Sequence, residues 1–139
     1  MSNTSLAVFS TTPPLCLVAQ PAVVPLSQLE RLEQQLLQAN DQAQTQWIED
    51  YLDLGLELAN AARKHHRFLL HTSWLKRLYR TLRDSASLPQ VSQAWRQRCV
   101  DALYQPLFAL QHHYQQQDDG ALRLRQIRQE LAVISRYWV

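Results

Sequence analysis

The sequence predicts an all-α protein, an up-and-down bundle of four to five helices with an extended N-terminal arm. The chain has 139 residues, enough for one domain with a hydrophobic core, and 46% of them are hydrophobic while 19% are charged. It contains 18 Gln but only 2 Gly, and sheets and tight turns usually need more Gly. Apolar residues recur at spacings of three and four, which is the period of an amphipathic helix.

Residues 1–26 are predicted to form the arm. They carry no charged side chain, four of the six prolines, and the apolar clusters LAVF and LCLVA. Prolines at this density disfavour a helix. Two alternatives stay open for this segment: a frayed terminus, or a stretch of chain that lies against the bundle or a neighbouring molecule.

The helical domain is predicted to span residues 27–139. It begins at Ser27, because SQLE is a capping-box pattern in which Ser27 and Glu30 satisfy free amide groups. The first helix is expected to end near Asn40, with Asp41 capping the next helix, although one bent helix is an alternative. Its apolar seam comprises Leu29, Leu32, Leu36, Ala39 and Ala43.

The second helix is predicted over residues 44–70. Gly55 lies in its apolar face, where the missing side chain either allows close approach by another helix or is merely tolerated. The opposite face has acids first and bases later, an order that complements the helix dipole. The apolar face comprises Trp47, Ile48, Tyr51, Leu52, Leu54, Leu58, Ala59 and Ala62, and the polar face Glu49, Asp53, Glu57, Asn60, Lys64, Arg67 and His71.

The third helix must be separate from the second. At about 100° per residue, its apolar face would otherwise point roughly 170° away from that of the second helix. The chain is therefore predicted to break within residues 70–74, with Thr72 or Ser73 as the new N-cap and an end near Arg83. The apolar face comprises Trp74, Leu75, Leu78, Tyr79 and Leu82.

The fourth helix is predicted to start at Pro89 and to run to about Tyr114, with a kink at Pro106. Its apolar face comprises Val91, Trp95, Cys99, Ala102, Leu103, Pro106, Ala109 and Leu110.

The fifth helix follows the DDG turn, where Asp118 or Asp119 is expected to cap it. Its inner seam comprises Leu124, Ile127, Leu131, Ile134 and Trp138. Leu122, Val133 and Tyr137 lie on nearly the opposite side of this helix. A helix that is apolar on two sides either lies centrally or contacts another subunit, so these three residues are the predicted protein interface.

The net charge of +2 hides an uneven distribution. Residues 30–57 carry seven acids against Arg31, a net charge of −6, whereas residues 63–98 carry nine bases against Asp84, a net charge of +8. The bases between residues 63 and 83 form either a phosphate-binding ridge for RNA or DNA, or ordinary solvated helix faces. The ridge residues are Lys64, Arg67, Lys76, Arg77, Arg80 and Arg83.

No pattern in the sequence predicts catalysis or a cofactor. The two glycines stand apart, so no phosphate-binding loop is present, and no nucleophile motif surrounds any Ser. His66 and His113 fall on apolar faces and are the best candidates for a metal or ligand site, but no Glu-x-x-His pattern accompanies them. We therefore expect buried, hydrogen-bonded histidines, no metal and no enzyme.

The chain is expected to be cytoplasmic. Cys16 and Cys99 lie far apart and outside any CxxC motif, so neither a disulfide framework nor a zinc knuckle is predicted. The N-terminus lacks the basic segment of a signal peptide, and no apolar run reaches transmembrane length, so no membrane partner is expected.

These observations favour a non-enzymatic interaction protein. We expect an adaptor, assembly factor or chaperone-like subunit that binds a protein partner and associates with itself as a dimer. The alternative is a small accessory subunit that binds RNA or DNA through the ridge.

Overall fold

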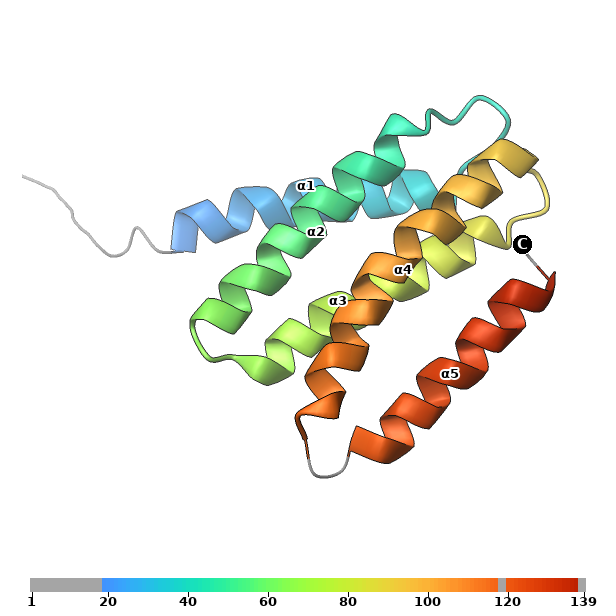
Figure 1. The fold of residues 1–139 in the computed structure, drawn as a ribbon. Coiled ribbons are helices and arrows are strands. Elements are labelled where there is room, and N and C mark those ends of the chain that lie inside the picture. The colour runs from blue at the N-terminus through green and yellow to red at the C-terminus, as the bar shows by residue number, and fades with distance from the viewer. Residues whose placement is uncertain (1–18, 118–119, 138–139) are drawn as a thin grey trace, which may run out of the picture. The chain divides into compact units, whose positions relative to one another are not determined.

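The fold is an all-α bundle, as predicted, in a computed structural model that describes residues 19–117 and 120–137. Those residues form five helices and no strand, and α2 to α5 run alternately up and down (Figure 1). The helices are α1 (Ala19–Leu37), α2 (Gln46–Lys64), α3 (Phe68–Ala86), α4 (Gln93–Gln115) and α5 (Gly120–Tyr137). The chain divides into two compact units, Met1–Arg31 and Leu32–Val139, of which the second contains α2 to α5.

The helix α1 begins at Ala19, so the predicted start at Ser27 is wrong. Pro21 falls in the first turn, where amide groups have no partner within the helix, and it is therefore compatible with an early start. Of the predicted arm, residues 19–26 are helical, and residues 1–18 lie outside the described part of the chain.

The predicted break between the first two helices is confirmed, because α1 ends at Leu37 and α2 starts only at Gln46. The amide of Gln42 donates to Oδ1 of Asn40 at 2.9 Å, a local side-chain turn that closes this loop. The N-cap of α2 is Thr45, so the expected cap at Asp41 is wrong.

The helices α2 and α3 are separate, as predicted, but the break lies at residues 65–67 and not within 70–74. The amide of Arg67 donates to the carbonyl of Ala62, and the amide of His66 donates to that of Arg63. These two bonds form a Schellman motif, which requires a left-handed residue at the position of His66. His66 has φ 59°, in the region that normally favours glycine.

Replacing His66 by Gly should therefore stabilise the protein. A left-handed backbone costs a residue with a Cβ more than it costs glycine, so we expect the free energy of unfolding to rise by about 1 kcal/mol. Denaturant titration followed by circular dichroism measures this change. His65→Gly is the matched control, because φ at His65 is −94° and glycine there only adds freedom to the unfolded chain. A gain in His65→Gly equal to that in His66→Gly would contradict this explanation.

The core lies where α3 packs against α2 on one side and α4 on the other, while α5 packs against α4. Gly55 confirms the close-packing interpretation, because a Cβ at this buried position would lie 2.8 Å from Cγ of Leu78 in α3. The largest fully buried side chains of α2 to α4 are Ile48, Tyr51, Leu75, Leu78, Leu82, Trp95, Val100, Leu103 and Leu107.

The start of α4 differs from the prediction. Pro89 lies in the preceding turn, and Ser92 is the N-cap, whose hydroxyl accepts a hydrogen bond from the amide of Trp95 at 3.1 Å. Pro106 lies inside the helix, as predicted, and is buried. Asp118 and Asp119, the expected caps of α5, lie outside the described residues.

Candidate interaction surfaces

The outer side of α5 exposes apolar residues, as its two-sided pattern predicted. Leu122 is 59% exposed and Val133 is 54% exposed, whereas Ile127 on the inner side is buried. Gln126 and Gln129 lie between Leu122 and Val133 on the same side and are also exposed. We call Leu122, Gln126, Gln129 and Val133 the outer stripe of α5. The side chains of Tyr137, Ile134 and Trp138 lie outside the described part of the structure.

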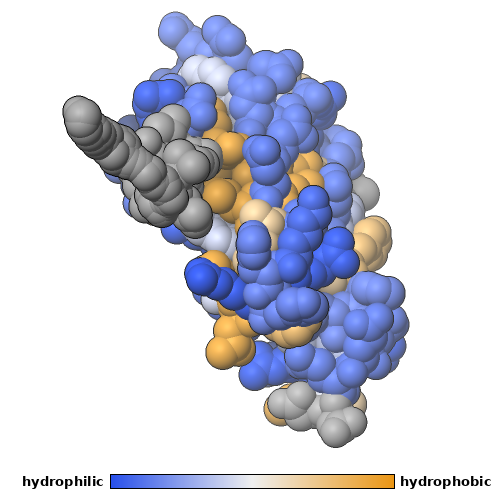
Figure 2. All heavy atoms as spheres, turned by 90° about the vertical axis from the view of Figure 1, so that its left-hand side faces the viewer, coloured by the Kyte–Doolittle hydropathy of each residue, from blue (hydrophilic) through white to orange (hydrophobic). Residues whose placement is uncertain are grey.

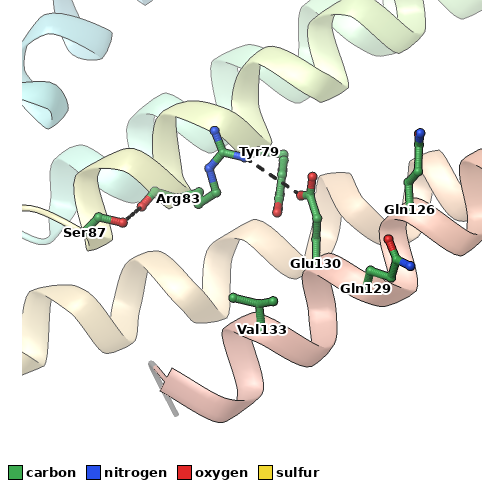
Figure 3. Close-up of a pocket in the computed structure, with 7 residues that line it drawn as sticks. All are labelled: Tyr79, Arg83, Ser87, Gln126, Gln129, Glu130 and Val133. Atoms are coloured by element: carbon green, nitrogen blue, oxygen red, sulfur yellow. Dashed lines mark hydrogen bonds and ion pairs between the residues drawn. The ribbon is translucent and has the colours of Figure 1, made fainter.

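A groove of about 710 Å³ separates α5 from α3, and three residues of this stripe line it (Figure 3). Its lining residues are Tyr79, Arg83, Ser87, Gln126, Gln129, Glu130 and Val133. Arg83 lies over the ring of Tyr79, 5.5 Å from its centroid, and lies 4.0 Å from a carboxylate oxygen of Glu130. Side chains therefore bridge α3 and α5, and Gln126, Gln129 and Val133 of the outer stripe line the α5 side of the groove.

The groove alters the acidity of Tyr79. Burial raises the pKa of its phenol, and the hydrogen bond and negative charge of Glu130 raise it further. The phenol is therefore neutral at physiological pH, and Tyr79 is not suited to acid–base chemistry there.

The six ridge residues do not form one uniform basic surface. Arg77 forms an ion pair with Glu33. Arg83 forms ion pairs with Asp84 and Glu130. Lys76 and Arg80 line a second hollow, of about 280 Å³, that also includes Glu130. Lys64 and Arg67 are exposed at the turn between α2 and α3.

Glu33, in the last part of α1 that belongs to the second unit, binds Arg77 in a network within that unit. Nε and Nη2 of Arg77 donate to the two carboxylate oxygens of Glu33 at 2.7 and 2.8 Å. The hydroxyl of the buried Tyr51 donates to the same carboxylate at 2.8 Å, and that of Thr81 at 3.4 Å. This arrangement holds a 16% exposed carboxylate in a bidentate pair, and it explains part of the basic ridge as a structural feature.

The histidines differ from the expectation. His66 is exposed, so the prediction that it is buried is wrong. His113 is half-buried; burial lowers the pKa of its imidazole, and the charges of His71 and His112 lower it further. His71, expected on a solvent face, is buried, with its Nδ1 2.9 Å from the carbonyl of Ala59. Among the described residues no cluster of three or more His, Cys, Asp or Glu is arranged to hold a metal ion.

The first turn of α3 exposes three consecutive apolar residues, Phe68, Leu69 and Leu70. We call them, with the bases Arg63, Lys64 and Arg67 just before them, the α2–α3 tip. Figure 2 faces the side on which this turn lies and shows hydrophobic residues at a largely hydrophilic surface. Sequence reasoning missed this feature because it placed residues 68–70 inside the second helix.

No family model matches this chain, and neither a curated protein nor a solved structure matches it. Within the part of the chain that the structure describes, none of the helices has the length and apolar character needed to cross a membrane.

Proposed function

We propose that this chain is a non-enzymatic interaction protein that binds other proteins through the outer stripe of α5, and that a second copy of the chain is one such partner. The observation that carries this proposal is the exposure of both Leu122 and Val133 on a helix that already buries Ile127 on its inner side. Exposed apolar residues beside a groove are typical of protein-binding surfaces.

The outer stripe is complementary to itself. Its members lie at intervals of four, three and four residues, with leucine and valine at the two ends and glutamines in the middle. When two copies of α5 lie antiparallel, Leu122 faces Val133 of the second copy and Gln126 faces Gln129. Apolar side chains then bury each other, and the amides exchange hydrogen bonds, as a two-fold interface requires.

The interface should be weak because a single pair of helices contributes it. The 18 residues of α5 extend over about 27 Å, and stable complexes generally bury about 1,200–2,000 Å² in total. We therefore expect a dimer in the micromolar range of concentration.

Sedimentation velocity of the intact chain and its variants tests this proposal. Leu122→Glu together with Val133→Glu should give a monomer, because two like charges would be buried against apolar groups. Ala132→Glu is the matched control, because Ala132 is an exposed position of the same helix outside the stripe. A wild-type chain that stays monomeric at high micromolar concentration would contradict self-association, as would an Ala132→Glu chain as monomeric as the double variant.

The proposal includes a cytoplasmic location. Cys99 is a free, fully buried thiol, and burial raises its pKa to about 12, so it is protonated and unreactive. Among the described residues Cys99 takes part in no disulfide, which is compatible with a reducing compartment.

A further inference from the structure

The α2–α3 tip has an unusual distribution of apolar side chains. Leu69 is 87% exposed, and Phe68 and Leu70 on either side of it are also exposed. Consecutive residues of a helix point about 100° apart, so these three side chains spread over about 200° around the helix end. A surface that lies along the side of α3 would contact only one or two of them. Only a partner that meets the helix end-on can bury all three.

The bases of the tip lie beside these apolar residues. Arg63, Lys64 and Arg67 are exposed, and in the described part of the chain none of them forms an ion pair with a carboxylate. The sequence from residue 58 to residue 83 contains no acid at all. Along this stretch of the chain the apolar side chains of the tip therefore follow exposed bases, with no acid among them.

Phe68, the first apolar residue of the tip, packs against other aromatic rings. The ring of Phe68 contacts those of His66 and His113, with centroids 5.9 and 6.1 Å apart, and His113 belongs to α4. The ring of His113 in turn lies 5.8 Å from that of the buried His71. Phe68 thus anchors the tip to the core through aromatic contacts, and Leu69 is the most exposed of the three apolar side chains.

We propose that the α2–α3 tip docks onto an anionic lipid surface, with Leu69 and its neighbours entering the boundary between headgroups and acyl chains. Basic residues around an apolar group are the combination that binds peripheral proteins to acidic membranes. A bilayer is fluid and closes around a projecting side chain, whereas a protein partner would need a hole of matching shape. The end-on spread of the three side chains therefore favours lipid. Such docking is independent of the stripe on α5 and needs no helix that crosses the membrane.

Vesicle flotation of the full chain tests this inference. The vesicles contain phosphatidylcholine alone, or phosphatidylcholine with about one third phosphatidylglycerol. We expect binding to the anionic vesicles at least about tenfold stronger than to the zwitterionic ones, and weaker binding when the salt concentration rises from about 0.1 to about 0.5 M.

Two variants separate the apolar and the charged contributions. Leu69→Ser should lower binding to anionic vesicles by about tenfold. Lys64→Gln with Arg67→Gln should lower it by about fivefold per base and flatten the salt dependence. Leu37→Ser is the control: Leu37 is 40% exposed and lies at the end of α1, far along the chain from the tip. Circular dichroism confirms that each variant is folded.

Several outcomes would overturn the inference. One is a wild-type chain that does not bind anionic vesicles at low salt. Another is a loss of binding to anionic vesicles that is as large in Leu37→Ser as in Leu69→Ser. If the tip variants weaken binding to a protein or to an oligonucleotide but leave vesicle binding unchanged, the tip serves that partner, and the lipid assignment is wrong.

Discussion

Replacing Trp95 by Ala should lower the free energy of unfolding by about 4 kcal/mol, the largest loss expected for a single substitution in this chain. The indole of Trp95 is 2% exposed and packs edge-on against Trp47, with ring centroids 6.4 Å apart. Its Nε1 donates to the hydroxyl of Ser85 at 3.0 Å, and that hydroxyl donates to the carbonyl of Leu36 at 2.6 Å. Removing the indole leaves a cavity and takes away a hydrogen bond that ties α4 to α3.

Urea titration of Trp95→Ala measures this loss, with Trp74→Ala as its control. Trp74 is half-buried and lies beside Arg77, whose guanidinium carbon is 5.3 Å from the ring centroid. We expect Trp74→Ala to cost about 1 kcal/mol, since it loses little buried area and one cation–π contact. Equal losses in the two variants would show that Trp95 contributes no more to the stability of the protein than the half-buried Trp74.

Replacing Arg77 by Met should lower the free energy of unfolding by about 3 kcal/mol. The substitution keeps an apolar stem but leaves the carboxylate of Glu33 without its bidentate partner in a largely buried place. Adding Glu33→Gln to Arg77→Met should recover part of the loss, because a neutral amide is cheaper to bury than an unpaired charge. If the double variant is less stable by the sum of the single losses, the two residues act independently and the network is not a unit.

The same pair makes stability depend on pH. Burial raises the pKa of Glu33, but the hydrogen bonds from Arg77, Tyr51 and Thr81 and the charge of Arg77 outweigh it, so the pKa lies below its ordinary value of 4.5. The pKa of Glu33 is thus lower in the folded protein than in the unfolded one. The ionised carboxylate therefore stabilises the fold at any pH above the unfolded-state pKa, and this contribution is lost as the pH falls through the folded-state pKa. The free energy of unfolding of Glu33→Gln should therefore vary less with pH, below about pH 4.5, than that of the wild type.

Much of the fold follows from periodicity. The spacing of apolar residues predicted four to five helices because each helix buries one side, and the apolar residues of α3, for example Leu75, Leu78 and Leu82, do form the core. The exposure of Leu122 and Val133 followed from the same geometry, because a helix that buries Ile127 must turn them outward.

The position of the break between α2 and α3 could not be predicted in this way. Helix ends with a Schellman motif usually show a glycine, and here His66 takes the left-handed position, so the usual signal is missing. This error of several residues also misplaced His71. When counted within α3, His71 shares the buried side with Leu75 and Leu78 at spacings of four and three. It is therefore a core residue and not part of the polar face of α2.

The pairing of Arg77 with Glu33 could not be predicted from the sequence either. The two residues are 44 positions apart in the chain, and no local pattern indicates which carboxylate a given base will meet after folding. The basic ridge was read from local charge alone, and for Arg77 and Arg83 the tertiary contacts supply a structural role that this pattern does not contain.

Cysteine cross-linking across the outer stripe of α5 tests the proposed function most directly. Chains with Gln126→Cys and chains with Gln129→Cys, each also carrying Cys16→Ser, are mixed and oxidised, and the tryptic peptides are identified by mass spectrometry. The antiparallel arrangement predicts that the peptide beginning at position 126 of one chain is linked to the peptide beginning at position 129 of another. A pair of Arg128→Cys chains, which place the thiol on another side of the same helix, should link far less. Linkage at position 128 as strong as that between positions 126 and 129, or no linkage at any of them, would contradict the interface.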